Sequence, residues 1–539
     1  MSSFDTPAPG AAGPGPAGVP GRPRRPRDGM VLALACVAQF MVVLDVSIVT
    51  VALPSIGRDL HYSPGGLQWV VNAYVLTFAG FLLLGGRAAD LFGRRRVYLF
   101  GIALFTAASL AGGVATDSAW LTAARAVQGV AGAFLSPATL TIIITTFSGD
   151  RRARALGVWS AVAGAGGAAG SVLGGVLTSA LSWRWVLFVN IPIGVAAIGA
   201  ALAWLAESPG PARGGAGARG GAGARDGARA RDGAGARLDV SGAITVTAGL
   251  GALIYAIVGT QTQPWGSART LSLLAAAAVL LAAFAVIELR LARSPLMPFG
   301  LLRSRSVSGA NTVMFLIGAA FFSMWYFLSL YLQNVLGYSA LRAGLAFLPM
   351  GITIIAGAQA SSRLLPRIGV RPLLQAGTLV AAGGFAWLSA ITPHASYWDQ
   401  VFGPACVISL ALGLLFTPLA AAATTGVPVT EAGLASGVLN TSRQIGGSLG
   451  LAVLATIATD RSHAVLAAGG RAVSLAAGLD DGYARAFQWA AAFCVAALAA
   501  SFVVPAIRPR ASRARASAAP ASEVPGAEAG QRPAPGTGR

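Results

Sequence analysis

Residues Leu44–Pro54, LDVSIVTVALP, place one carboxylate inside a long apolar segment. The segment runs from about Met30 to Leu53, and Asp45 is its only charged residue. A charged side chain at the centre of a bilayer costs roughly 2.5–3.5 kcal/mol on insertion scales, so Asp45 must face a partner or a wet cavity. Proline breaks helices, so Pro54 predicts where this helix ends as the chain leaves the membrane.

The rest of the chain is equally apolar. Of its 539 residues, 55% are hydrophobic and 11% are charged, and the mean hydropathy is +0.67. This composition indicates an all-α membrane protein with several spans. Apolar stretches of about 20 residues predict fourteen spans, near 30–53, 66–87, 96–114, 119–146, 154–180, 184–205, 240–261, 270–291, 308–333, 342–364, 370–391, 400–425, 432–459 and 484–506.

The basic residues predict the orientation of these spans. All 39 are arginines. With the N-terminus inside, 30 lie on or near the cytoplasmic side, seven lie on or near the outer side, and only Arg125 and Arg443 lie away from the ends of spans. Because basic residues concentrate in cytoplasmic loops, we predict a plasma-membrane protein with both termini in the cytoplasm. Nucleic-acid binding would need a basic groove with stacking aromatic residues, and arginines in short loops do not form one.

The predicted spans are grouped as six, two and six. A low-complexity Gly/Ala/Arg segment separates the first two groups, and its composition cannot bury apolar area. We therefore expect a disordered cytoplasmic tail over 1–29, a six-helix bundle over 30–205, a disordered cytoplasmic linker over 206–239, an inserted two-helix hairpin over 240–291, a second six-helix bundle over 308–506, and a disordered cytoplasmic tail over 507–539.

The loop after the second span reads GRAADLFGRRR and starts at Gly86. Its arginines alone fit a cytoplasmic turn, but Asp90 lies one helical turn after Gly86. A carboxylate there can accept hydrogen bonds from a helix N-terminus or an arginine, and so latch the cytoplasmic side. The glycines would permit close helix approach and a tight reversal. The pattern of Gly86, Asp90, Gly93, Arg94 and Arg95 resembles the signature loop of the major facilitator superfamily.

The fourth predicted span carries Arg125 in the sequence RAVQG, which looks like the Arg-x-x-Gln-Gly motif of that superfamily. An arginine within a span needs a partner, either a carboxylate or backbone carbonyls. At 1.5 Å per residue, Asp45 lies about 22 Å from the inner start of its span, and Arg125 lies about 9 Å below the outer face of a roughly 30 Å core. The depths agree, so an ion pair between the two residues, or competition for a shared proton, is geometrically allowed. We predict that Asp45 carries the coupling proton and that Arg125 sets its affinity for that proton.

A stripe of glycines marks the fifth predicted span. Gly166, Gly170 and Gly174 recur every four residues, with Gly175 beside them, and small residues at this spacing let helices pack closely. The stripe also resembles the superfamily's antiporter motif, whose core is Gly-Pro-x-x-Gly-Gly. Ser171 stands where that motif has proline.

The stretch SWRWVLFVNIPIG, from Ser182, is similar to a turn typical of fourteen-span drug/proton antiporters of the superfamily. This resemblance implies two six-helix bundles that enclose a cavity near the midplane and rock about it. It also implies proton-driven export of amphipathic, cationic or hydrophobic compounds. A dedicated exporter of one endogenous metabolite or peptide, on the same fold, is the alternative.

Polar and aromatic residues of the spans are the candidates for the substrate cavity. A single amide or aromatic residue in a span more often packs between helices, so we expect fewer than half of the ten candidates to line the path. They are Gln39, Asn72, Tyr74, Gln128, Trp159, Asn311, Trp325, Tyr326, Asn440 and Gln444.

An enzyme at a membrane face would need a cluster of His, Asp, Glu or Cys residues, and the sequence shows none. A non-transporting sensor would not need both Asp45 and Arg125. We therefore expect a monomeric transporter without catalytic residues, metal or cofactor, whose partners are a small-molecule substrate, protons and the lipid bilayer.

Overall fold

The computed structural model describes residues 26–63, 65–147, 149–205, 239–260, 263–292, 300–392, 396–427, 432–469 and 474–506. Within these ranges every regular element is a helix. A helix satisfies all its backbone hydrogen bonds internally, which a span in lipid requires. The expected all-α fold class is confirmed. The predicted tails and linker lie almost wholly outside the described residues.

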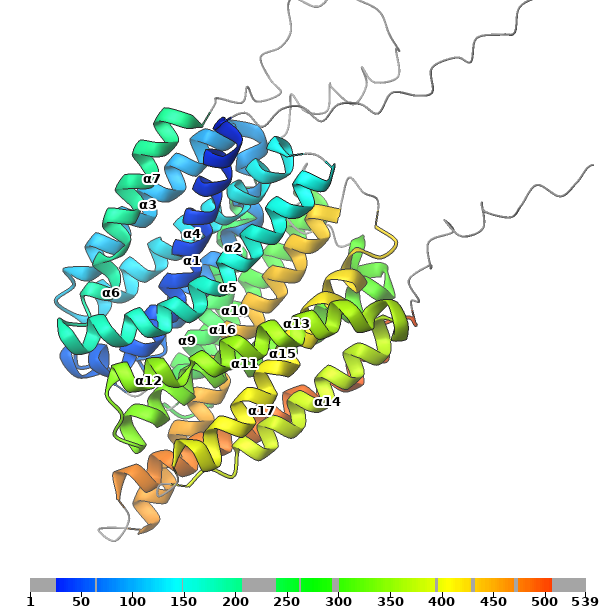
Figure 1. Cartoon of the computed structure of the whole chain (residues 1–539). Helices are drawn as coiled ribbons and strands as arrows, with labels where there is room; N and C mark the ends of the chain where they lie inside the picture. Colours follow the sequence, from blue (N-terminus) through cyan, green and yellow to red (C-terminus); the bar gives the residue numbers. More distant parts are fainter. Residues whose placement is uncertain are drawn as a thin grey trace, which may run out of the picture.

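The first group of helices forms one bundle (Figure 1). α1 and α5 pack together, α4 packs on α2 and α3, and α7 packs on α3. α1 continues beyond Pro54, so the prediction that this proline ends the helix is wrong; a membrane helix tolerates an internal proline when neighbouring helices compensate for the lost hydrogen bond. The elements are α1 (Pro26–Asp59), α2 (Trp69–Phe92), α3 (Arg94–Gly113), α4 (Ser118–Thr146), α5 (Gly149–Ala180), α6 (Trp185–Phe188) and α7 (Asn190–Trp204).

A pair of helices, α9 (Val240–Gly259) and α10 (Ala268–Val286), follows the first bundle, and a short π-helix, η2 (Ile287–Leu291), extends α10. α9 packs against α10, α2 and α16. Leu250 and Ile254 of α9 share a buried apolar cluster with Leu76 of α2 and Ala452 of α16. The pair therefore contacts one helix from each bundle.

The second bundle follows α10 and a short 3₁₀-helix, η3 (Leu301–Arg303). In it, α11 packs on α16, α15 packs on α13 and α14, and α17 packs on α11, α14 and α16 (Figure 1). The elements are α11 (Arg305–Leu330), η4 (Tyr331–Val335), α12 (Ala340–Ala346), α13 (Leu348–Ile368), α14 (Val370–Leu388), η5 (Tyr397–Val401), α15 (Phe402–Thr424), α16 (Ala432–Gly469) and α17 (Leu475–Ser501).

In the described part of the chain, 12 helical segments are long and apolar enough to cross a membrane. The protein is therefore a multi-pass membrane protein. α5 and α14, with 32 and 19 residues, are not among these segments, although both pack within the bundles. The fourteen-span count stays a prediction.

The two bundles touch near one membrane face. We name the faces after the ends of α1: the Pro26 face, where α1 begins, and the Asp59 face, where it ends. Close to the Asp59 face, Ser329 Oγ donates to the Thr50 carbonyl at 2.8 Å, and Gln333 Nε2 donates to the Val51 carbonyl at 2.9 Å. These bonds join η4 and the end of α11 to α1. They hold the bundles together on the Asp59 side.

Candidate functional site

Asp45 of α1 and Arg125 of α4 form a buried ion pair. Arg125 Nη1 donates to Asp45 Oδ2 at 2.5 Å, and the two side chains are 2% and 0% exposed. Arg125 Nε also donates to the Val70 carbonyl of α2 at 3.0 Å. Arg125 therefore has both kinds of partner considered from the sequence, a carboxylate and a backbone carbonyl. The ion pair that the matching depths allowed is present, and the role in proton coupling stays a prediction.

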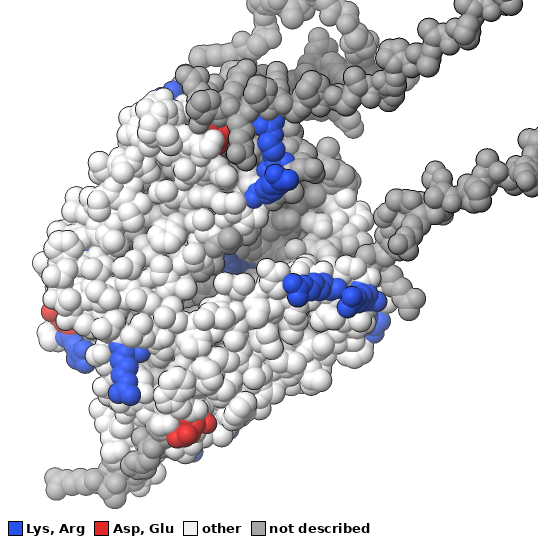
Figure 2. Space-filling view, viewed as in Figure 1, with Lys and Arg blue, Asp and Glu red and all other residues white. Residues whose placement is uncertain are grey.

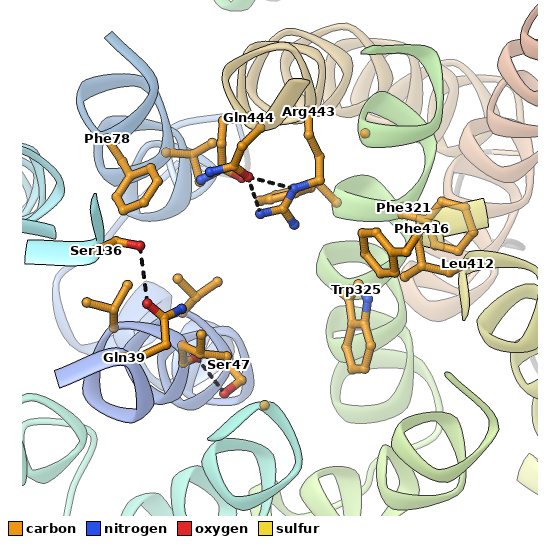
Figure 3. A pocket seen from close by; sticks show the side chains of 18 of the residues that line it. Gln39, Ser47, Phe78, Ser136, Phe321, Trp325, Leu412, Phe416, Arg443 and Gln444 are labelled. Atoms are coloured by element: carbon orange, nitrogen blue, oxygen red, sulfur yellow. Dashed lines mark hydrogen bonds between the residues drawn. The ribbon is translucent and has the colours of Figure 1, made fainter. Parts of the chain in front are cut away.

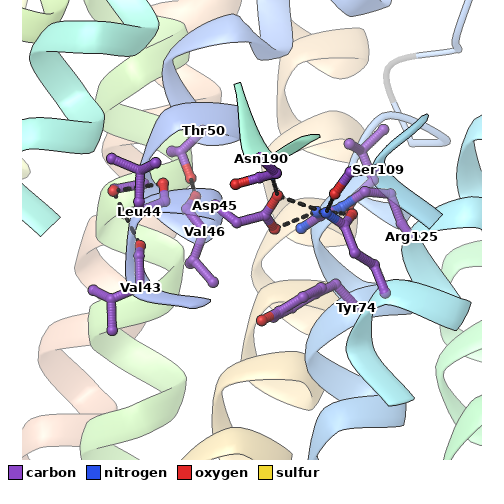
Figure 4. Close-up of polar contacts among 12 residues, drawn as sticks. Val43, Leu44, Asp45, Val46, Thr50, Tyr74, Ser109, Arg125 and Asn190 are labelled. Atoms are coloured by element: carbon purple, nitrogen blue, oxygen red, sulfur yellow. Dashed lines mark hydrogen bonds and ion pairs between the residues drawn. The ribbon is translucent and has the colours of Figure 1, made fainter. Parts of the chain in front are cut away.

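Three further polar side chains complete this group, which we name the Asp45 network (Figure 4). Gln128 Nε2 donates to Asp45 Oδ1 at 2.8 Å, and its Oε1 accepts from Arg125 Nη1 at 2.7 Å. Asn190 Nδ2 donates to Asp45 Oδ1 at 3.0 Å. Ser109 Oγ lies 2.7 Å from Gln128 Nε2. Both carboxylate oxygens are thus held by side chains from α4 and α7.

Sequence reasoning missed two members of the Asp45 network. Asn190 carried a usable signal, because it is an amide within an apolar segment, and such amides tend to bond across helices. Ser109 gave no such signal, since the hydroxyl of a serine in a helix commonly bonds to a backbone carbonyl of the same helix. Gln128 was predicted for the cavity, but it belongs to the Asp45 network instead.

Tyr74 of α2 lies against the Asp45 network. The Arg125 guanidinium carbon is 4.4 Å from the centre of the Tyr74 ring, close enough for a cation–π interaction. The Tyr74 hydroxyl is buried and has no hydrogen-bond partner among the described residues. α4 approaches α2 here through glycine: a Cβ on Gly129 would collide with the Tyr74 carbonyl, and one on Gly132 would lie 3.0 Å from the Tyr74 hydroxyl.

A cavity of about 870 Å³ lies between the two bundles. Figure 2 shows the surface hollowed between the bundles. Ile144 and Leu83, both near the Pro26 end of their helices, line the cavity, so it extends toward the Pro26 face. Seven of the ten predicted cavity residues line it, more than we expected: Gln39, Tyr74, Trp159, Trp325, Tyr326, Asn440 and Gln444.

Three of the ten candidates do not line the cavity: Gln128 belongs to the Asp45 network, and Asn72 and Asn311 bond between helices. Asn72 Oδ1 accepts from Ser448 Oγ at 3.2 Å, which ties α2 to α16. Asn311 Oδ1 accepts from Ser442 Oγ at 2.8 Å, which ties α11 to α16. Both amides therefore have the packing role that single polar residues in spans commonly have.

The loop between α2 and α3 is reduced to one residue, Gly93, whose φ is +92°. A residue with a Cβ rarely adopts this conformation, so the predicted tight reversal is confirmed. Arg94 begins α3, and Arg95 Nη2 donates to the Leu202 carbonyl of α7 at 2.9 Å. The side chain of Asp90 lies outside the described residues, so the predicted latch remains untested.

In this region α2 and α4 approach each other closely at Gly85, one residue before the predicted position, Gly86. A Cβ on Gly85 would collide with the Ala133 carbonyl of α4. A Cβ on Gly86 would lie 3.8 Å from Pro137 Cβ, an ordinary contact. The prediction of close approach at Gly86 is therefore wrong.

The glycine stripe of α5 packs against α1. A Cβ on Gly166, Gly170 or Gly174 would lie only 3.1, 2.8 or 2.7 Å from a backbone carbonyl oxygen of α1, and the three carbonyls are those of Phe40, Leu44 and Ile48. The predicted close packing is confirmed, and it holds the turn of α1 that carries Asp45.

Gly175 faces the second bundle instead. A Cβ there would lie 2.6 Å from the Ala340 carbonyl of α12, and a Cβ on Gly344 of α12 would collide with the Ser171 carbonyl of α5. Glycines thus bring the bundles into backbone contact, and the residue at the proline position of the resembled motif takes part.

A metal site would need several ligating side chains in one place. Among the residues that the structure describes, no group of three or more His, Cys, Asp or Glu residues is placed to hold a metal ion.

Comparisons with known proteins agree with this architecture. Residues 35–451 match the family described as Major Facilitator Superfamily. The chain is 44% identical to the cephamycin export protein CmcT of Amycolatopsis lactamdurans, over 88% of this chain and 92% of that protein. It is 39% identical to the puromycin resistance protein pur8 of Streptomyces alboniger, over 87% and 88% of the two chains.

One solved structure with a similar fold is a bacterial homologue of the human lysosomal transporter Spinster, in an inward-facing and occupied conformation. The TM-score is 0.61 at 16% identity, and the match covers 89% of this chain and 97% of that one.

Proposed function

Because the chain belongs to the major facilitator superfamily, we propose that it exports drugs or antibiotics from the cell by proton-coupled antiport with alternating access. Relatives with an export or resistance function support the substrate class. The observation that carries the coupling is the Asp45–Arg125 ion pair, which is buried in the first bundle beside a cavity large enough for a drug-sized molecule.

The proposed topology has fourteen spans, with both termini in the cytoplasm and the Pro26 face turned inward. The arginine asymmetry supports it, because basic loops stay on the cytoplasmic side. The proposal also keeps the domain boundaries predicted above and treats α9 and α10 as an inserted hairpin. The protein would then lie in the plasma membrane as a monomer with an inward-open cavity.

Coupling depends on two charge states of the Asp45 network. With Asp45 ionised, its carboxylate balances the Arg125 guanidinium inside the bundle. Protonation removes that charge and leaves Arg125 held by Gln128 Oε1 and the Val70 carbonyl. A buried cation without a counter-ion is unfavourable, so the two charge states favour different packing of α1 against α4.

The direction of transport depends on which membrane face the cavity is open to. In the present arrangement the bundles meet near the Asp59 face, through Ser329 and Gln333. Outward opening requires these bonds to break and the bundles to close on the Pro26 side. If the proton and the substrate favour opposite charge states of Asp45, inward proton flow drives substrate outward.

The test uses the full-length protein in proteoliposomes with an imposed pH gradient. Each of several unrelated fluorescent drugs should move against its concentration gradient, and collapsing the gradient with a protonophore should stop that movement. Equal transport with and without the gradient would contradict proton coupling. Transport of one compound alone would favour the alternative function, dedicated export of one endogenous metabolite or peptide.

A further inference from the structure

Arg443 is a charged residue in the cavity wall that the proposed coupling does not use. It lies on α16, and a Cβ on Gly318 of α11 would collide with its backbone carbonyl, so its backbone packs closely against α11. Its side chain extends into the hollow between the bundles (Figure 3). The cavity that it enters is lined by residues of both bundles.

Among the residues that the structure describes, the Arg443 guanidinium has no counter-ion. Arg443 Nε and Nη2 donate to Asn440 Oδ1, one turn earlier on α16, at 3.2 and 2.9 Å. In the described parts of the chain it forms no ion pair, in contrast to Arg125, whose charge Asp45 balances. Neutral amide oxygen replaces only part of the hydration that a cation loses on burial.

Among the described residues of the cavity wall, no carboxylate compensates for this charge. The described residues that line the cavity include no Asp or Glu, and Arg443 is the only charged residue among them. The wall is mostly apolar and aromatic, which strengthens the field of an uncompensated charge. Such a cavity attracts anions and repels cations.

The neighbouring residue adds a second unsatisfied group. Gln444 Oε1 is buried without a hydrogen-bond partner in the part of the chain that the structure describes, and Gln444 also lines the cavity. A ligand that brought an anionic group to Arg443 and an N–H or O–H donor to Gln444 would satisfy both. Trp325, Phe321 and Phe416 offer an apolar wall nearby (Figure 3).

We propose that the cavity selects amphipathic substrates that carry an anionic group such as a carboxylate, and that Arg443 binds this group. The inference rests on the proposed export function and narrows its substrate class. It departs from the cationic compounds that the family resemblance implied, because a cation would meet an unbalanced guanidinium.

The test measures binding to the full-length protein in detergent, by fluorescence anisotropy and without any gradient. Two xanthene dyes serve as probes: carboxyfluorescein, an anion, and tetramethylrhodamine methyl ester, a cation. The wild-type protein should bind the anion more tightly. Arg443→Gln should weaken carboxyfluorescein binding by roughly tenfold or more, because charge-assisted hydrogen bonds are lost. Arg443→Lys keeps the positive charge, so its affinity for carboxyfluorescein should fall much less.

Arg485→Gln is the matched control, because Arg485 is exposed on α17 and does not line the cavity. It should leave binding of both dyes unchanged. If Arg443→Gln does not yield folded protein, the dye preference of the wild type and the Arg443→Lys variant decide the question. Tighter wild-type binding of the cation, or unchanged anion binding in Arg443→Gln, would overturn the proposal.

The same dyes separate this inference from the export function. If neither dye moves under a pH gradient in proteoliposomes, while the anion preference and its dependence on Arg443 persist in detergent, the proposed export fails and the anion site stands. If both dyes are driven by the gradient, but binding is indifferent to Arg443, the anion site fails and export stands.

Discussion

The ring of Tyr74 contacts the Arg125 guanidinium at 4.4 Å and also forms part of the cavity wall. Tyr74 therefore belongs to both parts of the site. Asp45, Arg125 and the other members of the Asp45 network do not line the cavity themselves. A substrate that displaces the Tyr74 ring would change the surroundings of Arg125 without touching the ion pair, which gives a physical route between substrate and proton.

Two substitutions of Tyr74 should distinguish the contribution of its ring from that of its hydroxyl. Tyr74→Phe keeps the ring over Arg125 and removes a hydroxyl that has no partner among the described residues, so stability and transport should be close to wild type. Tyr74→Leu removes the cation–π contact, worth about 2 kcal/mol or more in a desolvated site, and should impair drug-driven proton flux. Thermal unfolding and a pH-sensitive dye inside vesicles report the two effects. Equal loss in both variants would assign the role to the hydroxyl.

Asp45→Asn should abolish efflux driven by a pH gradient, because the amide cannot take up and release the coupling proton. Downhill substrate flux should remain, since the cavity is unchanged. The control is Asp59→Asn at the other end of α1, where the carboxylate is half exposed and pairs with Arg184. Undiminished proton-driven transport in Asp45→Asn vesicles would refute the assignment.

Arg125→Gln should destabilise the protein by about 3–5 kcal/mol, because it leaves the buried Asp45 carboxylate without its cation. Adding Asp45→Asn to the same chain removes the uncompensated charge and should restore part of the lost stability. Thermal unfolding of both single variants and the double variant measures this coupling. Additive losses would mean that the pair contributes no interaction energy.

Gly170→Ala should destabilise the first bundle by about 1–3 kcal/mol, since an added methyl group would meet the Leu44 carbonyl at 2.8 Å and α1 must move. Gly157→Ala on the same helix has no atom within 4 Å of the new methyl group and should be neutral or slightly stabilising. Unfolding temperatures in one detergent provide the comparison. Similar values for the two variants would show that α1 and α5 can separate without cost.

Asp90→Asn should reduce transport while the protein still inserts and folds, because a carboxylate at the membrane interface adds little to the cost of insertion. The proposed reason is loss of a charged acceptor that latches the Pro26 side. Transport in vesicles, normalised to folded protein by size-exclusion chromatography, is the measurement. Normal transport would leave the loop with a role in topology alone.

The pairing of Asp45 with Arg125 could be predicted from sequence, because the physics leaves few alternatives. Each is an isolated charge in an apolar segment, and a charge in lipid requires a partner. Helix rise then relates sequence position to depth, and the two depths matched. The same logic predicted the reversal at Gly93 and the packing of the α5 glycines, since both depend on local chain geometry.

Other features depended on how the helices are placed in space. Asn190 and Ser109 reach the Asp45 network from α7 and α3, and periodicity does not reveal which face of a helix meets which neighbour. For the same reason, Gln128 joined the network rather than the cavity, and close approach fell at Gly85 rather than Gly86.

Arg443 shows this limit most clearly. Its position within a span was visible in the sequence, as was that of Arg125. Whether a carboxylate stood opposite depended on the rotation of α16 against its neighbours, because side chains on different helices meet only through packing. That packing left one arginine paired inside a bundle and the other facing a cavity without a counter-ion in the described residues.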